Sequence, residues 1–242
     1  MLLIGISTYN EIESLPQLVR RILEVVPDCR LLVVDDNSPD GTGKWCDEYA
    51  AKDKRLFCCH RAGKLGLGTA TVAVLNYAVE HNFDVVVTMD ADMSHDPRFL
   101  PSLIQGLEQP SPVDVVIGSR YVPGGGVEGW PWKRRMMSWL VNRFARFWLQ
   151  LPAKDTSGAF RCYRVQTLRN LDLTVIISQG YSVFEELLWR LRHVGATMRE
   201  VPITFVDRDV GQSKISLREA IRSVFCLIGL RFRDSKGSTK SA

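Results

Sequence analysis

Short apolar runs alternate with segments of helical periodicity through the first 120 residues. Runs rich in Val, Leu and Ile predict strands over residues 2–7, 30–34, 56–59, 83–89 and 113–117. Between these runs, apolar residues recur three or four positions apart, which predicts helices over residues 12–26, 43–52, 68–81 and 97–109. Such alternation is typical of an α/β fold whose mostly parallel sheet is covered by helices on both faces.

The alternation ends after Arg120. A proline and three glycines at residues 123–126 predict a flexible turn, and the glycine-rich stretch 121–132 is a candidate for a loop that closes over a ligand. Residues 133–151 and 217–232 predict amphipathic helices rich in Arg and aromatic residues, as found at membrane interfaces. A core-packing helix with snorkelling arginines would give the same pattern. No transmembrane helix or signal peptide is expected.

The two halves of the chain differ in charge. The chain has 242 residues, 45% hydrophobic and 24% charged, as in an ordinary globular protein. Residues 1–119 hold 17 acidic and 10 basic residues, whereas residues 120–242 hold 21 basic and 10 acidic ones. An acidic first half fits a metal-dependent site. A basic second half fits a phosphate ligand or an anionic membrane surface, or is simply a solvated basic face. No nucleic-acid partner is expected.

The six cysteines form no CxxC pair and no spacing typical of zinc ligands. We interpret them as reduced thiols of a cytoplasmic protein.

Two carboxylates, Asp90 and Asp92, follow the run that ends at Met89. In open α/β sheets, ligands bind beyond the carboxyl ends of the strands. Oxygen ligands suit a hard cation such as Mg²⁺ or Mn²⁺, which usually shares its coordination shell with substrate phosphates. The pair therefore predicts a metal that holds a diphosphate.

Polar segments also follow the first three predicted strands. An aromatic ring at Tyr9 and carboxylates at Glu11 and Asp36 are suited to a nucleoside, while glycines around Lys64 allow backbone amides to approach phosphate. Taken singly, each segment could be a turn with capping residues. Their convergence at one sheet edge favours a binding site.

Further motifs extend this set. In chain order the full set is Thr8-Tyr9-Asn10-Glu11, Val34–Thr42, Gly63-Lys64-x-Gly66-Leu67-Gly68, Asp90-Ala91-Asp92, Ser94-His95-x-Pro97, Gly118–Tyr121, Gly126-Val127-x-Gly129-Trp130, Lys133-Arg134, Ser138, Gly158-x-Phe160-Arg161, Gly180-Tyr181 and Val201–Lys214. The set resembles the family 2 glycosyltransferases of the GT-A (Rossmann-like) fold. The longer pattern, over roughly residues 2–232, resembles the dolichyl-phosphate mannose synthases among them.

The resemblance implies an inverting transfer of mannose from GDP-mannose to a dolichyl or other polyprenyl phosphate, with Mg²⁺ or Mn²⁺ as cofactor, on the cytoplasmic face of a membrane. It implies a single catalytic domain over residues 1–232, followed by a polar, flexible tail over residues 233–242. Some relatives require a small membrane-protein partner, and the sequence leaves this open.

The resemblance also implies roles for individual residues, at the positions of this chain that match the motifs of the family. The donor nucleotide would be bound by Ser7, Tyr9, Glu11, Asp36, Asp40, Lys64, Asp90 and Ala91. The metal would be bound by Asp90, Asp92 and Ser94. The acceptor phosphate would be bound by Arg120, Arg134, Ser138, Arg208 and Lys214, and catalysis would rest on Asp92, Arg120 and Arg208. Ser94 departs from relatives that have glutamine at this position, and a serine hydroxyl is a weaker ligand.

Three alternatives stay open at this stage. The donor could be UDP-glucose or UDP-N-acetylglucosamine, because few contacts set the identity of the base. The chain could be a sugar-phosphate nucleotidyltransferase, although its first turn lacks a glycine-rich triphosphate loop. It could also be a non-catalytic module that binds membranes through the two basic helices.

Overall fold

In a computed structural model the described residues are 1–178, 180–207 and 217–232, with the backbone alone described at 217–223. The predicted roles of Arg208 and Lys214, and the predicted tail, fall outside these ranges.

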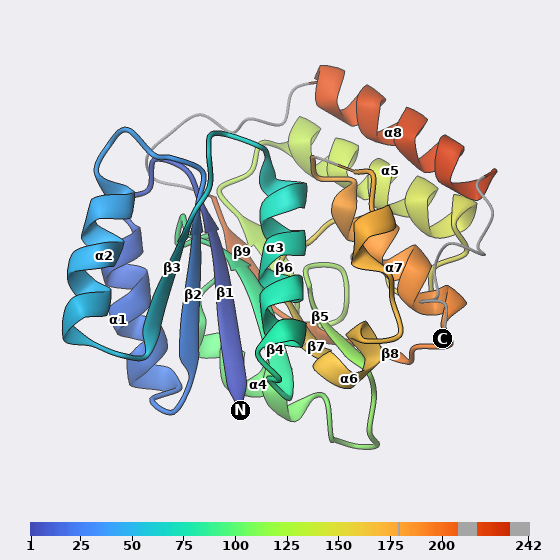
Figure 1. The fold of residues 1–242 in the computed structure, drawn as a ribbon. Helices are drawn as coiled ribbons and strands as arrows, with labels where there is room; N and C mark the ends of the chain where they lie inside the picture. The colour runs from blue at the N-terminus through green and yellow to red at the C-terminus, as the bar shows by residue number, and fades with distance from the viewer. Residues whose placement is uncertain (179, 208–216, 233–242) are drawn as a thin grey trace.

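A seven-stranded sheet in the order β3-β2-β1-β4-β7-β5-β8 forms the centre of the molecule (Figure 1). Its strands are β1 (Leu2–Thr8), β2 (Arg30–Asp35), β3 (Leu56–His60), β4 (Val85–Asp90), β5 (Val115–Ser119), β7 (Arg161–Arg164) and β8 (Met198–Pro202). Only β7 runs antiparallel to its neighbours, β4 and β5. The predicted α/β class with a mostly parallel sheet is therefore confirmed.

Consecutive apolar residues along each strand enter two different cores. Leu32 and Val86 belong to one hydrophobic cluster, whereas their neighbours Val33 and Val87 belong to the other. Because side chains alternate between the faces of a strand, a strand covered on both faces reads as one continuous apolar run. This is why β1, β2, β4 and β5 could be predicted from the sequence.

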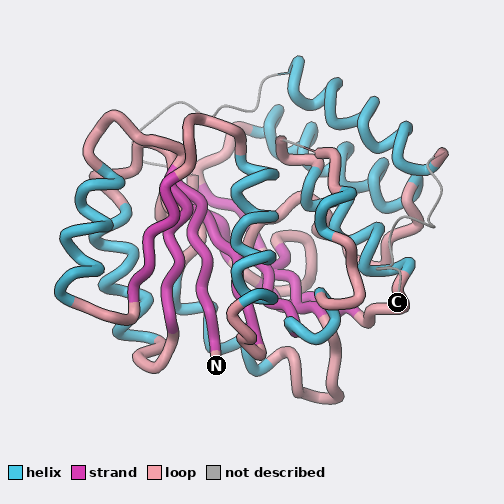
Figure 2. Tube along the Cα trace, in the orientation of Figure 1, coloured by secondary structure: helices cyan, strands magenta, loops and turns pink. Residues whose placement is uncertain are grey.

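Helices cover both faces of the sheet (Figure 2). One core includes residues from α1 (Leu15–Val25), α2 (Thr42–Lys52) and α4 (Leu100–Gln105). The other includes residues from α3 (Leu67–Glu80), α5 (Trp132–Trp148), α6 (Val165–Leu168), α7 (Val183–His193) and α8 (Leu217–Arg231). The predicted helix over residues 97–109 is wrong in extent, because a 3₁₀ turn, Pro97–Phe99, precedes α4 and a second proline, Pro101, lies in its first turn.

A small second sheet contains part of the stretch expected to be a closing loop. Strand β6 (Gly126–Glu128) pairs in parallel with β9 (Thr204–Val206), and Trp130 just beyond β6 is only 6% exposed. Residues 121–132 are thus anchored over part of their length, which the glycine content of the sequence did not reveal.

Helices α5 and α8 lie side by side at one end of the molecule (Figure 1). On α5 the polar Asn142 is buried, while Met136, Leu140 and Phe147 are exposed. These exposed apolar side chains of α5 face away from the core, whereas Ala145 is buried in it and Phe144 and Trp148 pack against it. The helix therefore has both a core-packing side and an exposed apolar side. No helix among the described residues is long and apolar enough to cross a bilayer.

Candidate active site

The carboxyl ends of β1, β2 and β4 meet in one row. Ser7 on β1 lies opposite Val34 of β2 on one side and Asp90 of β4 on the other. The chain leaves β1 toward β2 and reaches β4 only after β3, so the strand order reverses here, and open α/β sheets bind ligands at such a position. A cleft of about 270 Å³ opens at this edge.

Fourteen residues line the cleft: Ser7, Thr8, Tyr9, Glu11, Asp36, Lys64, Gly66, Leu67, Ala70, Asp90, Ala91, Asp92, Gly180 and Tyr181. Most of the residues that the motifs assign to the donor and the metal are among them. Two are not, Asp40 and Ser94, and both have other partners in the structure.

Asp40 stabilises the turn between β2 and α2. One carboxylate oxygen accepts hydrogen bonds from the backbone and the hydroxyl of Thr42, and the other accepts one from the backbone N–H of Ile12. Burial raises the pKa of Asp40, but these hydrogen bonds outweigh it and keep that pKa below its ordinary value. Asp40 thus ties the turn after β1 to the start of α2, and its described contacts are structural.

Asp36 holds the glycine-rich loop that follows β3. Its Oδ1 pairs with Arg61 Nε at 2.7 Å, and its Oδ2 accepts hydrogen bonds from the backbone of Leu65 and Gly66, both at 3.1 Å. The side chain is only 6% exposed. Its negative charge therefore orders the loop that presents Lys64, whose Nζ lies 4.1 Å from the centre of the Tyr9 ring.

The turn that carries Asp90 and Asp92 is rigidly built. Met93 adopts a left-handed φ of 64°, and the N–H and hydroxyl of Ser94 both donate to Asp92 Oδ1. The buried His95 accepts a hydrogen bond from the backbone N–H of Asp90 at its Nδ1, at 3.1 Å. Ser94 and His95 thus orient the two carboxylates.

The carboxylates fit a divalent cation. Asp90 and Asp92 both line the cleft, and the side chain of Asp90 is 22% exposed. Two protein carboxylates leave most of an octahedral shell for water and phosphate oxygens, as Mg²⁺ sites usually do.

Aromatic rings connect this turn to a group of arginines. His95 packs between Phe160 and Phe205, with ring centres 5.1 and 5.4 Å away. Phe205 also contacts Trp130 at 5.3 Å, and the guanidinium of Arg134 lies 4.1 Å from the centre of the Trp130 ring. Strand β9, which carries Phe205, therefore links the carboxylate turn to α5.

Arg120 forms a buried bidentate pair with Asp155. Its Nε and Nη2 each lie 2.7 Å from a carboxylate oxygen, and Nη2 also donates to Ser157 Oγ at 2.9 Å. Although burial alone would raise the pKa of Asp155, the charge and hydrogen bonds of Arg120 lower it. The Nη1 of Arg120 makes no hydrogen bond within the part of the chain that the structure describes. This nitrogen is suited to an anionic ligand.

Two other predicted acceptor residues, Arg134 and Ser138, lie on α5. Ser138 Oγ is 2.8 Å from the hydroxyl of Tyr121, and Arg134 Nη1 lies 2.9 Å from both carboxylate oxygens of Asp207. The buried Asn142 donates to the carbonyl of Ser138 and to Ser157 Oγ. Ser157 therefore connects α5 to the Arg120–Asp155 pair.

Several residues at the site were not assigned from the sequence. Gly180 and Tyr181 reach the cleft from far along the chain, Asp155 neutralises Arg120, and His95 orients Asp90. His95, Gly180 and Tyr181 lie within motifs used for the resemblance, which was the available signal. Nothing in the local pattern around Asp155 indicates its partner 35 residues earlier.

Comparison with known proteins defines the class. The model of the family "Glycosyl transferase family 2" matches residues 3–172. The chain belongs to this family, and its mostly parallel sheet and flanking helices are those of the GT-A fold.

Two curated relatives are much more similar to this chain in sequence than the solved structures are. An undecaprenyl-phosphate mannosyltransferase of Micrococcus luteus is 46% identical over 211 residues, covering 87% of this chain and 86% of the relative. A polyprenol monophosphomannose synthase of Mycolicibacterium smegmatis is 42% identical over 226 residues, covering 92% and 84%.

Solved structures agree on the fold. Glucosyl-3-phosphoglycerate synthase of Mycobacterium tuberculosis, in complex with Mn²⁺, UDP and phosphoglyceric acid, superposes with a TM-score of 0.63 at 18% identity, over 95% of this chain and 78% of that one. The mannosyltransferase PcManGT of Pyrobaculum calidifontis, in complex with GDP-Man and Mn²⁺, gives 0.62 at 16% identity, over 99% and 65%.

Proposed function

We propose that this chain transfers mannose, with inversion, from GDP-mannose to a polyprenyl phosphate at a membrane surface. The observation that carries the proposal is a carboxylate-lined cleft close to Arg120 and Arg134. Arg134 lies in the first turn of α5, a helix with exposed apolar side chains. The names of the two curated relatives support the sugar and the class of acceptor.

The donor would occupy the cleft at the ends of β1, β2 and β4. Tyr9 and Glu11 line the part that suits the nucleoside, and Lys64 supplies positive charge from the loop ordered by Asp36. A Mg²⁺ or Mn²⁺ ion bound by Asp90 and Asp92 would neutralise charge on the leaving diphosphate.

The acceptor phosphate would lie against Arg120, Arg134 and Ser138. A phosphate monoester has a second pKa of about 6 and is ionised near neutral pH, so it needs no strong general base. Its oxygen attacks the anomeric carbon, a new C–O bond forms, and the old bond breaks with its electron pair passing to GDP. The two arginines would bring this anion close to the anionic donor, which is the main electrostatic task of the site.

A groove of about 950 Å³ along α5 would accept the polyprenyl chain. Its lining runs from Tyr121, next to Ser138, past Leu140 and Phe144 to Phe147, with Arg143 and Arg146 beside them. Phe225 on α8 and Phe232 just after its end extend the exposed apolar surface. Aromatic and basic side chains on neighbouring helices are suited to an anionic membrane surface without crossing it.

The test is transfer of radiolabel from GDP-mannose to a short polyprenyl phosphate, with Mg²⁺, with Mn²⁺ and with EDTA. We expect metal-dependent label in the lipid phase. UDP-glucose and UDP-N-acetylglucosamine run in parallel, because no described contact identifies the base. Label from a UDP-sugar alone would contradict the donor assignment, and metal-independent transfer would contradict the assignment of Asp90 and Asp92.

A further inference from the structure

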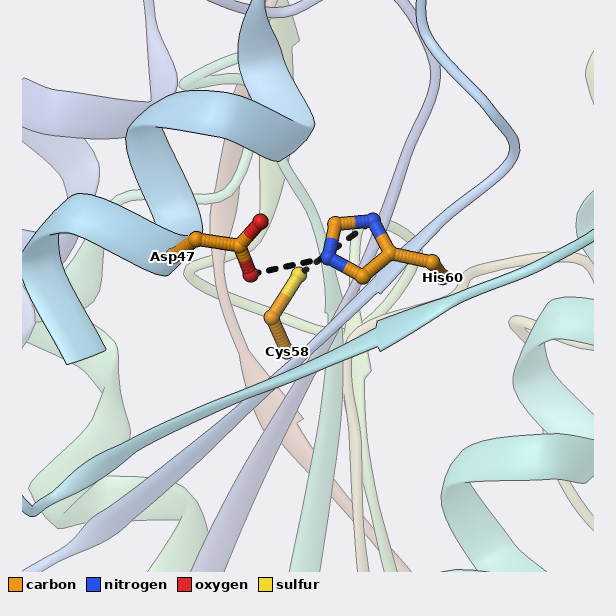
Figure 3. Close-up of side chains that lie close together, drawn as sticks. All are labelled: Asp47, Cys58 and His60. Carbon is orange, nitrogen blue, oxygen red and sulfur yellow. Dashed lines mark hydrogen bonds and ion pairs between the residues drawn. The ribbon is translucent and has the colours of Figure 1, made fainter. Parts of the chain in front are cut away.

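Asp47, Cys58 and His60 form a cluster of metal-ligating side chains outside the cleft (Figure 3). One ligand atom from each residue lies within 4.8 Å of the other two. Asp47 is on α2, whereas Cys58 and His60 are two positions apart on β3, so both point to the face of the sheet that α2 covers. Figure 3 shows the three side chains converging between helix and strand.

The contacts within the cluster are already close. His60 Nε2 is 2.9 Å from Asp47 Oδ1, and His60 Nδ1 is 4.0 Å from the sulfur of Cys58. A Cβ at Gly43, in the first turn of α2, would lie 3.1 Å from the His60 ring, so the missing side chain leaves room for the imidazole.

From this geometry we infer that Asp47, Cys58 and His60 bind a zinc ion that joins α2 to strand β3. Thiolate, imidazole and carboxylate are the three ligand types of zinc sites, and sulfur and nitrogen disfavour the Mg²⁺ or Mn²⁺ that suits Asp90 and Asp92. In a tetrahedral zinc site the ligand atoms lie about 3.5 Å apart, so shifts of about 1 Å would complete the shell. The side chains of His60 and Asp47 are 47% and 62% exposed, which gives an ion and a fourth ligand, water, access from solvent.

The position of the site gives it a structural consequence. Strand β3 is at the edge of the sheet, and His60, its last residue, pairs in register with Asp35. The next residue in the sequence after Asp35 is Asp36, which accepts the hydrogen bonds that hold the loop carrying Lys64. A zinc ion would therefore fix the edge strand next to the donor cleft, and this inference does not depend on the identity of the sugar.

The test is a zinc titration of the metal-stripped full chain against a chromophoric chelator. We expect one zinc ion per chain. Because outer-shell partners alone are worth about 10–100-fold in metal affinity, loss of a ligand in Cys58→Ser or His60→Ala should weaken binding by about 100-fold or more. Substitution with Co²⁺ should give a thiolate-to-metal charge-transfer band that is absent in Cys58→Ser.

Matched controls lie next to the ligands. Cys59→Ser changes the adjacent thiol on the opposite face of β3, and Glu48→Gln changes the next carboxylate on α2, so both should bind zinc normally. The same set is then melted with and without zinc. Only chains with all three ligands should gain thermal stability.

Three results would overturn the inference: no zinc bound by the wild-type chain, unchanged affinity in Cys58→Ser, or a Co²⁺ complex without a thiolate band. Any of them would leave Asp47 and His60 as an ordinary surface ion pair. The titration of the wild-type chain is by itself sufficient to reject the zinc site, so the test still works if a variant fails to fold.

Discussion

The two halves of this molecule build their parts of the site in different ways. In the first half, the side chains follow directly on strands β1, β2 and β4, whose shared edge brings Tyr9, Asp36 and Asp90 together. In the second half, Arg120 and Arg134 are positioned by partners far along the chain, Asp155 and Asp207. Topology therefore places the donor residues, whereas individual ion pairs place the acceptor residues.

This contrast predicts opposite responses to substitution. Changes at Tyr9, Asp90 or Asp92 should reduce activity while leaving the fold intact, because these side chains are partly exposed and the sheet supports them. Changes at the acceptor pairs should cost both activity and stability. The following variants test the contrast, from the largest expected effect to the smallest.

Asp92→Asn removes a charge from the carboxylate turn. We expect kcat to fall by about 10³-fold, the upper end of what one electrostatic contact to a transition state contributes. The melting temperature should stay within a degree or two of wild type. Kinetics at saturating Mn²⁺ and a thermal melt measure both. Asp84→Asn, at the other end of β4, is the control, and a comparable loss of activity there would contradict the assignment.

Asp155→Asn breaks the buried pair with Arg120. Removing one partner of such a pair leaves an unpaired buried charge and costs about 3 kcal/mol of unfolding free energy. The pKa of Asp155 is lowered in the folded chain, so its stabilisation is present at neutral pH and lost as pH falls below the ordinary carboxyl range near 3.9. Denaturant melts of both chains should therefore differ at pH 7 and converge in acid. A constant difference would show that the charge is not responsible.

His95→Phe keeps a ring between Phe160 and Phe205 but removes the acceptor for the Asp90 N–H. Residues that orient a metal ligand are worth about 10–100-fold in affinity or activity. We expect the Mn²⁺ concentration for half-maximal activity to rise by this factor. We also expect that saturating Mn²⁺ restores most of kcat. A fall in kcat that metal does not rescue would contradict a positioning role.

Glu185→Gln tests a buried carboxyl next to the arginine pairs. Burial raises the pKa of Glu185 to about 7, and its Oε2 has no hydrogen-bond partner among the described residues. Because the folded pKa lies above the unfolded value of about 4.3, wild-type stability is lost as pH rises between these values. The glutamine variant should be more stable at pH 8, by on the order of 3 kcal/mol, and equal to wild type below pH 4.

Phe147→Ser tests the exposed face of α5. Phe147 is 78% exposed, and burying such a side chain in lipid is worth about 1.5 kcal/mol or more, which corresponds to about a tenfold loss of vesicle binding. Turnover of a short, water-soluble acceptor should not change. Phe57→Ser, exposed on the edge strand β3, is the control for flotation with anionic vesicles. Equal losses from both variants would contradict a specific membrane face.

The two halves of the molecule also differ in how well their strands could be predicted from the sequence. Strands β1, β2, β4 and β5 and the carboxylate turn at Asp90 could be predicted, because a strand buried on both faces leaves a continuous apolar run and its end is a known place for ligands. The edge strand β3 is half-exposed and was predicted from a short apolar run alone. The antiparallel strand β7 and the half-exposed β8 could not, because neither carries such a run.

The site residues divide in the same way. Asp40 and Ser94 were assigned to ligands and do not line the cleft; their side chains bond Thr42 and Asp92, because short polar side chains readily satisfy nearby backbone and turn groups. Their assignment to ligands stays a prediction. The partner of Arg120 could not be inferred, because an ion pair between residues distant in sequence leaves no local pattern.

The most direct test of two separately built binding regions is a titration of two variants with two ligands. Asp92→Asn and Arg134→Ala would each be titrated with GDP in the presence of Mn²⁺ and with a short-chain polyprenyl phosphate. We predict that Asp92→Asn loses GDP and keeps the lipid phosphate, and that Arg134→Ala does the reverse. Loss of the same ligand in both variants would contradict the account.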